Sequence, residues 1–371
     1  MKKALLYACI ENNIGDDLFI YTICKRYPDY YFYVSSEAKY GSLKDIENLR
    51  FSYIFNIWQK AANFGNRRGL KLFVSKILTS IFSVYLKKFS TSIYVVGNAF
   101  KCYNYQGKNQ SEWFKQRVSL TKNFYLISTN FGPYSDFQWV IDFKEHFRKA
   151  TNVCFRDEVS YNLFKDLENV SWAPDAVLSL GHRENTKNLS KKKILISIID
   201  CSYETRPNYI KKHQYEYEKK LIELSNYYLN KEYTVNILTS NNLQDYPAAK
   251  RIQNECFKQS GKAPGIIEYE GDYDQIFEEY RKSDYIIATR LHAIILAWIY
   301  NLPVIPIIYD IKVRTLLNAY MFENLSIELE SINNVSVDDV DEALKNYNFK
   351  NLDNLYRDAN NQFKELDKIL L

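Results

Sequence analysis

An arginine and a histidine, Arg290 and His292, stand two positions apart between two apolar runs. The first run, 285–288, has the composition of a buried parallel strand, and the second, 293–300, has that of a buried helix. A guanidinium matches a carboxylate or a phosphate with paired N–H donors, and an imidazole exchanges protons near neutral pH. This pair therefore predicts a site for a small anion at the junction of a strand and a helix.

A lysine occupies a similar place after the next predicted strand, 304–307. Lys312 follows that strand closely, and Asp310 lies between the two. Ligands of doubly wound sheets bind where strands end and helices begin, so we expect Lys312 to face the same crevice as Arg290. Two cations beside an imidazole favour a multiply charged anion such as a phosphorylated carboxylate. Asp310 either positions Lys312 or caps the helix that follows.

The elements that must position these residues alternate along the chain, which predicts an α/β protein with parallel sheets. In the first half the expected strands are 4–9, 31–34, 53–57, 93–96, 124–128 and 152–155, and the expected helices are 16–26, 71–87, 111–120, 137–148 and 158–167. In the second half the expected strands are 194–199, 234–238, 265–268, 285–288 and 304–307, and the expected helices are 207–229, 246–259, 273–282 and 313–320.

A polar segment without apolar periodicity separates the two halves. We therefore predict an N-terminal Rossmann-like domain over 1–180, a linker over 181–193 and a C-terminal Rossmann-like domain over 194–335. The remaining residues, 336–371, predict polar C-terminal helices, and such a tail can pack back across both domains.

The composition is that of an ordinary globular protein, with 46% hydrophobic and 25% charged residues in 371, enough for two domains with separate cores. The chain has 32 tyrosines and 22 phenylalanines. Tyrosine suits carbohydrate contact, but codon bias in an AT-rich genome explains the excess more simply, because Lys, Ile and Asn are also abundant. The net charge of +5 is mild and does not indicate nucleic-acid binding.

Cysteine and histidine usage gives no sign of disulfides or metal. The six cysteines are scattered without a C-x-x-C pair, and the four histidines are far apart. The apolar run 4–10 is too short for a signal peptide, and acidic residues follow it. Prolines interrupt the longer run 291–309, which fits a helix followed by a strand better than a membrane span. A reducing, cytoplasmic location is expected.

One segment suggests contact with a membrane. Basic residues gather around the apolar segment 70–89, namely Lys60, Arg67, Arg68, Lys71, Lys76, Lys87 and Lys88. A basic amphipathic helix over 67–89 can lie on an anionic membrane surface, which would place the protein at the inner face of the membrane. The alternative is an ordinary surface helix that packs its apolar side on its own domain.

Several motifs extend the pattern around Arg290. The chain reads Arg290-Leu291-His292-Ala293, then Pro303-Val304-Ile305-Pro306, then Tyr309-Asp310-Ile311-Lys312-Val313, and Asn13-Ile14-Gly15-Asp16-Asp17 follows the first predicted strand. Weaker matches are Arg156-Asp157 with Ser160, Gly132-Pro133 and Pro174-Asp175. Taken in their order along the chain, these motifs resemble those of the polysaccharide pyruvyltransferase family, whose members move pyruvate from phosphoenolpyruvate onto a sugar as a ketal.

The resemblance implies a fold similar to GT-B glycosyltransferases, with two Rossmann-like domains facing each other across a cleft. It also implies phosphoenolpyruvate as co-substrate without a further cofactor, and a sugar acceptor of capsule, exopolysaccharide or cell-wall assembly, such as a lipid-linked sugar. One departure concerns the run of glycines that the family usually has after its third or fourth strand. Here Gly97 stands alone before Asn98 and Ala99, which limits how closely backbone and ligand can approach and would reshape the acceptor side.

By this resemblance the donor is held by Arg156, Arg290, Leu291, His292 and Lys312. Arg156 follows a predicted strand of the first domain, as Arg290 does in the second; alternatively, it is an exposed residue paired with Asp157. His292 is expected to act as a general acid, as a general base or as a phosphate ligand. Lys312 is expected to stabilise the leaving phosphate.

The acceptor side is predicted to comprise Asn13, Asp16, Asp17 and Asn98, on the first domain. Carboxylates can accept hydrogen bonds from sugar hydroxyls or remove a proton from the attacking oxygen, which makes Asp16 and Asp17 candidate catalytic bases. Alternatively, Asn13 and Gly15 form a tight turn and Asp16 caps the next helix.

Two other functions remain open on the sequence. A GT-B glycosyltransferase would use a nucleotide-sugar donor, with Glu268 or Glu270 placed to bind the ribose. A catalytically silent carbohydrate-binding subunit would explain the lone Gly97, although it would have no need for Arg290, His292 and Lys312 together. Neither G-x-G-x-x-G nor a Walker A motif is present, so NAD and ATP are not predicted.

Overall fold

The computed structural model describes residues 2–10, 12–34, 41–52, 80, 83–102, 108–184 and 192–371, without the side chains of 108–110, 112, 113 and 116. The chain divides into two compact units. Unit 1 comprises Met1–Glu11, Asp16–Ser179 and Arg357–Leu371, and unit 2 comprises Asn12–Gly15 and Leu180–Tyr356. The predicted strand 53–57 and most of the predicted helix 71–87 lie outside the described residues.

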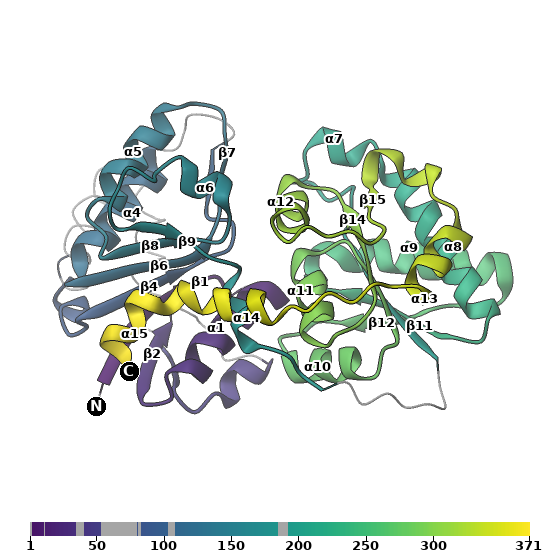
Figure 1. Cartoon of the computed structure of the whole chain (residues 1–371), viewed down its shortest axis with the longest axis horizontal. Helices are drawn as coiled ribbons and strands as arrows, with labels where there is room; N and C mark the ends of the chain where they lie inside the picture. The colour runs from purple at the N-terminus through teal and green to yellow at the C-terminus, as the bar shows by residue number, and fades with distance from the viewer. Residues whose placement is uncertain are drawn as a thin grey trace, which may run out of the picture. The chain divides into compact units, whose positions relative to one another are not determined.

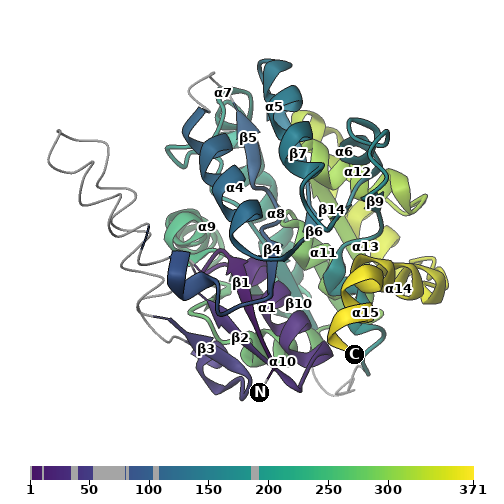
Figure 2. The ribbon, with the colours of Figure 1, turned by 90° about the vertical axis from the view of Figure 1, so that its left-hand side faces the viewer.

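Unit 1 is built on a parallel sheet with the strand order β3-β2-β1-β4-β6-β8-β9, and Figure 2 shows its first strands side by side. The strands are Lys2–Ala8 (β1), Tyr30–Val34 (β2), Leu49–Phe51 (β3), Thr91–Val95 (β4), Asn123–Thr129 (β6), Asn152–Phe155 (β8) and Val170–Trp172 (β9). Figure 1 shows Lys108–Leu120 (α4), Gln138–Phe147 (α5) and Glu158–Asn162 (α6) over one face, and Ile14–Arg26 (α1) and Lys364–Leu370 (α15) on the other. Counting outward from β1, this is the order of a doubly wound sheet.

The core under α4 and α5 is strongly aromatic. The ring of Phe100 lies 4.8 Å from that of Phe143, and the ring of Phe131 lies 4.8 Å from that of Phe164, both edge to face. Phe100–Cys102 (β5) and Phe131–Tyr134 (β7) pair as a small parallel sheet of their own. At these positions the phenylalanines of the sequence serve internal packing, where such ring pairs add stability beyond their buried area.

Unit 2 repeats the plan, with the strand order β12-β11-β10-β13-β14-β15. The strands are Lys193–Ser197 (β10), Thr234–Thr239 (β11), Gly265–Glu268 (β12), Tyr285–Ala288 (β13), Val304–Ile308 (β14) and Ile327–Glu328 (β15). The helices are Asn208–Lys211 (α7), Gln214–Asn230 (α8), Asn242–Ser260 (α9), Tyr273–Arg281 (α10), Leu291–Ile299 (α11), Ile311–Ala319 (α12) and Val337–Lys345 (α13). The strands β8, β12 and β13 have the predicted bounds, and the α/β class with parallel sheets is confirmed.

Several predicted helix bounds were wrong. The helix expected over 207–229 is two helices, α7 and α8, and the one expected over 158–167 ends at Asn162. The helix expected from 246 begins at Asn242, because the side chain of Asn241 caps it by accepting a hydrogen bond of 3.2 Å from the Gln244 main-chain N–H. Because the helix starts earlier than predicted, Asp245 lies in the first turn of α9.

The chain crosses between the units more than once. Asp353–Ala359 (α14) leads from unit 2 into unit 1, where α15 lies against the sheet (Figure 1). Arg26 donates two hydrogen bonds to the Asp367 carboxylate, of 2.9 and 2.6 Å. The buried Gln362 amide donates to the carbonyl oxygens of Phe155 and Ala173. The predicted bounds of the two domains, 1–180 and 194–335, and of the linker, 181–193, remain a proposal.

The α13 helix is fastened to unit 2 through one carboxylate. Asp341 accepts hydrogen bonds from Lys231 and Lys345, both 2.7 Å, and from the Tyr227 hydroxyl at 2.8 Å. Burial raises the pKa of Asp341, but these donors outweigh burial and lower the pKa to about 2.

We expect Asp341→Asn to destabilise unit 2 by about 1–2 kcal/mol at neutral pH, because it removes a buried carboxylate that accepts hydrogen bonds from two exposed lysines. The folded-state pKa is lower than the unfolded one, so the stabilisation is complete above pH 4 and is lost as the pH falls towards 2. Urea unfolding of both proteins at pH 7 and near pH 3 measures this. A gap in unfolding free energy that stays constant between the two pH values would contradict the assignment.

Among the described residues, no helix is long and apolar enough to cross a membrane. Within the same ranges, no group of three or more His, Cys, Asp or Glu side chains is placed to hold a metal ion. All six cysteines are free thiols.

Candidate active site

The predicted donor residues of unit 2 gather at the carboxyl ends of β13 and β14. Arg290 is the N-cap residue of α11, with extended backbone angles, and His292 is the second residue of that helix. Lys312 is the second residue of α12. The strands β10 and β13 are neighbours at the point where the strand order reverses, and doubly wound sheets bind ligands there.

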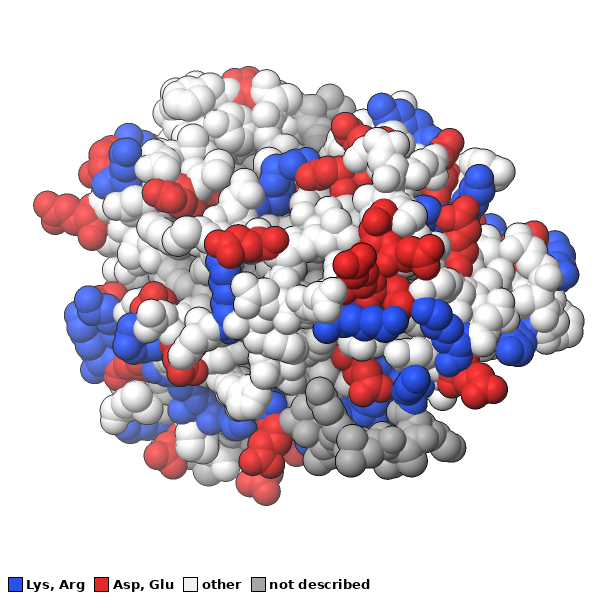
Figure 3. Space-filling view, turned by 45° about the vertical axis from the view of Figure 1, so that its right-hand side comes forward, with Lys and Arg blue, Asp and Glu red and all other residues white. Residues whose placement is uncertain are grey.

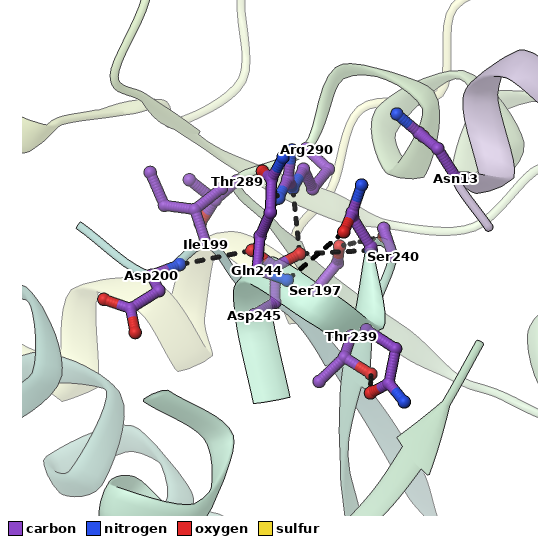
Figure 4. Close-up of polar contacts among 12 residues, drawn as sticks. Asn13, Ser197, Ile199, Asp200, Thr239, Ser240, Gln244, Asp245, Thr289 and Arg290 are labelled. Carbon is purple, nitrogen blue, oxygen red and sulfur yellow. Dashed lines mark hydrogen bonds and ion pairs between the residues drawn. The ribbon is translucent and has the colours of Figure 1, made fainter. Parts of the chain in front are cut away.

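A buried carboxylate holds Arg290 in place. Nε and Nη2 of Arg290 donate to the two oxygens of Asp245, at 3.1 and 2.5 Å, and Nη2 also lies 3.3 Å from Oε1 of Gln244. Figure 4 shows Arg290 above this carboxylate. Burial alone lowers the pKa of Arg290, but the Asp245 carboxylate and Tyr309 outweigh it, so that the pKa is raised and the guanidinium stays charged.

Asp245 itself is fixed by the main chain. Its oxygens accept N–H groups from Asp200 and Asn241, both at 3.2 Å, and its side chain is 0% exposed. Sequence reasoning missed this residue, because the predicted helix began one position after it. The signal that could have found it is an acidic residue shortly after β11, a strand that lies two strands from the arginine's own strand β13.

One edge of the Arg290 guanidinium remains for a ligand. Nη1 makes no hydrogen bond with any residue in the described ranges, and the side chain is 15% exposed. The next residue, Leu291, has a buried side chain, so only its main-chain N–H, at the positive end of α11, could contribute to binding. Arg290 thus has the arrangement of an anion clamp.

His292 packs against Gly15. A Cβ atom built on Gly15 would lie 2.2 Å from Nδ1 and 2.6 Å from Cε1 of the imidazole, closer than any real contact allows. The segment Asn12–Gly15 belongs to unit 2, where Ile14 N–H donates to Ser240 O at 3.1 Å and Asn13 bridges to Asn241. A glycine is therefore required at position 15 because the imidazole of His292 lies against its backbone.

This placement corrects the expectation that Asn13 lies on the first domain. Asn13 is in unit 2, where its side-chain oxygen accepts the Gly15 main-chain N–H at 3.0 Å. The turn predicted as the alternative is present, but α1 begins at Ile14, so Asp16 lies inside the first turn instead of capping it. Asp17 is 0% exposed, which disfavours direct contact with a sugar. Asp16 is partly exposed and stays the proposed acceptor-side carboxylate.

Gly15→Ala is expected to lower kcat about 100-fold, because the new methyl group must displace the imidazole by an ångström or more. The fold should survive, since alanine is the better residue inside a helix. Steady-state kinetics measure the first effect and thermal unfolding the second.

The control is a double-mutant cycle with His292→Ala. The alanine at 292 removes the ring that the new methyl group displaces, so Gly15→Ala should have little further effect in that background. Two losses that multiply would show that Gly15 acts on something other than His292.

Lys312 stands beside Asp310 on the rim of the site. Asp310 caps α12 by accepting the Lys312 main-chain N–H at 3.1 Å, and its other oxygen lies 3.9 Å from Nζ. Both roles considered for Asp310 therefore apply, with the cap as the closer contact. The Lys312 side chain is 21% exposed, which leaves its ammonium group accessible to an anion.

Arg156, in unit 1, is held differently from Arg290. Its Nε donates to Asn130 Oδ1 at 2.6 Å, its Nη1 to Asp175 Oδ2 at 2.8 Å and its Nη2 to the Gly97 carbonyl at 2.9 Å. All three nitrogens are engaged, and the side chain is 6% exposed. This disfavours Arg156 as a donor clamp and favours a role in shaping its own unit.

The alternative considered for Arg156, an exposed residue paired with Asp157, was wrong, because its side chain is largely buried and pairs with Asp175. Asp157 caps α6 by accepting the Ser160 N–H at 2.8 Å. Gly97 packs against Arg156, since a Cβ there would lie 3.1 Å from Nη1. The lone glycine of this segment thus makes room for a side chain of the protein. The next residue, Asn98, is partly exposed and stays a proposed acceptor contact.

The face drawn in Figure 3 carries both basic and acidic groups, which lie next to one another at several places. The net charge of the whole chain is only +5. We therefore expect a small anion to be recognised by individually placed cations instead of by a general field.

Comparison with known sequences decides the family. The sequence profile of the polysaccharide pyruvyl transferase family matches residues 13–311. The chain belongs to this family. The match begins at Asn13, includes Arg290 and His292, and ends at Ile311, one residue before Lys312. A search of curated proteins finds no match.

Solved structures show which fold this pyruvyl transferase family member has. HepE of Anabaena, in complex with UDP-glucose, superposes with a TM-score of 0.55 at 10% identity, over 99% of this chain and 97% of that one. The UDP-GlcNAc 2-epimerase of Methanocaldococcus jannaschii, in complex with UDP-GlcNAc and UDP, gives 0.53 at 11% identity, over 99% and 100%. The fold is GT-B-like, as predicted.

Proposed function

We propose that this protein transfers pyruvate from phosphoenolpyruvate to a sugar as a ketal, in the assembly of a surface polysaccharide. The observation that carries the proposal is the arrangement of Arg290, His292 and Lys312 at the ends of neighbouring strands of unit 2. An arginine edge without a partner in the described ranges, an imidazole and an accessible ammonium group suit a donor with a carboxylate, a phosphate and an enol carbon that must gain a proton.

The reaction makes definite demands on these groups. C3 of the enol gains a proton, C2 is attacked by one sugar hydroxyl, the bond from C2 to the phosphate oxygen breaks, and a second hydroxyl closes the ketal on C2. Each hydroxyl gives up its proton, one matching the proton gained by C3 and one leaving with phosphate. In this scheme Arg290 binds an anionic group of the donor, Lys312 stabilises the leaving phosphate and His292 moves a proton.

Calorimetric titration of the protein with phosphoenolpyruvate, and in parallel with UDP and GDP, tests the donor. Saturable binding of phosphoenolpyruvate that is lost in Arg290→Ala supports the proposal. Binding of a nucleotide without binding of phosphoenolpyruvate would refute the proposed pyruvate transfer and favour a glycosyltransferase.

The glycosyltransferase alternative has one observation in its favour, the bound UDP-sugars of the two solved structures with this fold. The carboxylates considered for ribose binding offer it limited support. Glu268 accepts a hydrogen bond of 3.0 Å from Asn242, so its carboxylate is already engaged. Glu270 is exposed. A silent carbohydrate-binding subunit would bind sugar but neither phosphoenolpyruvate nor nucleotide in the same titrations.

We also propose that unit 1 contacts an anionic membrane, which would suit a lipid-linked acceptor and place the protein at the cytoplasmic face. Of the segment 67–89, only 80 and 83–89 are described. A hollow next to the start of β1 is lined by five lysines, Lys2, Lys3, Lys87, Lys88 and Lys122, together with Tyr30 and Phe89. Each lysine near a negative surface adds about 1 kcal/mol of attraction.

Co-sedimentation with vesicles tests this contact. The protein should bind vesicles that contain phosphatidylglycerol and not pure phosphatidylcholine vesicles, and salt should weaken the binding. Lys87→Glu with Lys88→Glu should abolish it, whereas Lys258→Glu with Lys282→Glu in unit 2 should not. Equal binding by the two double variants would refute a role for the lysine-lined hollow.

A further inference from the structure

Tyr309 carries a hydroxyl group that the fold does not use. The residue follows β14 directly and is 6% exposed. Its hydroxyl oxygen is shielded from solvent and makes no hydrogen bond with any residue in the described ranges. Buried hydroxyls normally have a partner, because losing hydrogen bonds to water destabilises the folded chain. A group left in this way beside a predicted anion site is placed to bind a ligand.

Three cations lie near the Tyr309 side chain. Nζ of Lys312 lies 5.3 Å from the centre of the Tyr309 ring, and the guanidinium carbon of Arg206 lies 5.6 Å from it. Burial alone raises the pKa of Tyr309, but the charges of Lys312, Arg290 and Arg206 bring it below its ordinary value. The hydroxyl is therefore close enough to all three to feel their field, which also strengthens it as a hydrogen-bond donor to an anion.

The guanidinium charge of Arg206 is not neutralised by a carboxylate in the described ranges. Its contacts are long, 3.4 Å from Nε to the Asp200 carbonyl and 3.5 Å from Nη2 to Gln244 Oε1. That same oxygen accepts from Arg290 at 3.3 Å. Gln244 thus places the two guanidinium groups side by side at one end of the sheet. Nothing in the motifs around Arg290 pointed to Arg206.

We propose that Tyr309 and Arg206 complete a phosphate subsite, in which the Tyr309 hydroxyl donates a hydrogen bond to a phosphate oxygen and Arg206 and Lys312 balance its charge. The Nη1 edge of Arg290 is then left for the carboxylate of the donor. The identity of the donor rests on the proposed function; the phosphate chemistry rests on the three cations and the buried hydroxyl. No bond is made or broken by Tyr309 in this role.

Calorimetric titration with phosphoenolpyruvate, inorganic phosphate and pyruvate separates the parts of the site. In Tyr309→Phe and in Arg206→Gln we expect the Kd for phosphoenolpyruvate and for phosphate to rise about tenfold or more. The Kd for pyruvate, which lacks the phosphate, should change less than about twofold. Tyr215→Phe and Arg314→Gln change an exposed tyrosine on α8 and an exposed arginine on α12, and both should bind all three ligands as the unmodified protein does.

Thermal unfolding without ligand guards against a merely structural explanation. Tyr309→Phe removes a buried hydroxyl without a partner in the described ranges, so its Tm should stay the same or rise. A lower Tm together with unchanged phosphate affinity would assign Tyr309 to packing and overturn the subsite.

The titrations also distinguish the two proposals from each other. Phosphate affinity that is lost in both variants, with phosphoenolpyruvate bound no better than phosphate, upholds the subsite while the proposed function fails. Phosphoenolpyruvate binding that depends on Arg290 but not on Tyr309 or Arg206 upholds the function while the subsite fails. No phosphate binding by the unmodified protein, or an equal loss of pyruvate affinity in both variants, also overturns the subsite.

Discussion

Replacing His292 by alanine should lower kcat about a thousandfold while the Kd for phosphoenolpyruvate changes less than about threefold. A thousandfold loss corresponds to about 4 kcal/mol of barrier, the size of a well-placed proton-transfer group. Donor binding should persist because Arg290 and Lys312 carry the charges that hold the anion. Phosphate release from phosphoenolpyruvate in the presence of sugar acceptors measures the rate, and calorimetry measures the binding.

His292→Gln is the matched control, because it keeps a hydrogen-bonding side chain but cannot exchange protons. If His292 only binds phosphate, the glutamine variant should recover much of the rate. If it moves a proton, glutamine should be as slow as alanine. Turnover close to that of the unmodified protein in His292→Ala would remove the residue from the chemistry altogether.

Arg290→Ala should weaken phosphoenolpyruvate binding at least 100-fold, because a charged, paired hydrogen bond to an anion is among the strongest polar contacts a site can offer. Arg290→Lys keeps the charge but loses the planar fork, and we expect a loss of about tenfold. Calorimetric titration measures both.

Stability must be followed in the same variants. The alanine variant leaves Asp245 buried without its cation, and breaking such a pair costs about 3–5 kcal/mol. Arg314→Ala, which removes an exposed arginine paired with Glu328 on α12, is the matched control and should bind the donor normally. An Arg290→Lys variant that is folded and binds phosphoenolpyruvate with unchanged affinity would exclude the clamp.

The strands that carry the site could be predicted because they are continuous apolar runs. Ile286 and Ile287 in β13 are buried on both faces of the sheet, and this double burial is why the run has no polar alternation. The short strands β3, β9 and β15 were missed. With two or three residues each, they hold their place through pairing with a neighbouring strand, and their own sequence carries no periodicity.

The cationic members of the site could be predicted, but their partners could not. Arg290 could be predicted because it directly follows an apolar strand. Asp245 is 45 positions away in sequence and contacts Arg290 only because β11 lies two strands from β13 in the folded sheet. The same applies to Arg156 and Asp175 in unit 1. Whether a charged group serves a ligand or the fold depends on such distant counter-ions, and a single sequence does not show them.

Gly15 presents the opposite case. Its motif can be identified from the sequence, which favours a turn residue at Gly15. That interpretation does not explain why a side chain at this position would clash with His292. Its Cα is against the His292 imidazole, a contact between residues 277 positions apart in sequence that no local pattern encodes. The hydroxyl of Tyr309 is similar, because its lack of a partner in the described ranges becomes visible only once the surrounding side chains are placed.

The crossing of the chain between the units bears on the order in which a ribosome can complete them. Unit 1 includes Arg357–Leu371, where Gln362 binds main-chain groups at the ends of β6, β8 and β9. The last part of unit 1 is therefore synthesised after all of unit 2, although domains usually fold as they emerge, the N-terminal one first. The sheet of unit 1 must wait, incompletely covered, through the translation of the 177 residues Leu180–Tyr356. Stalled or truncated chains should accordingly expose to chaperones the face of this sheet on which α15 lies.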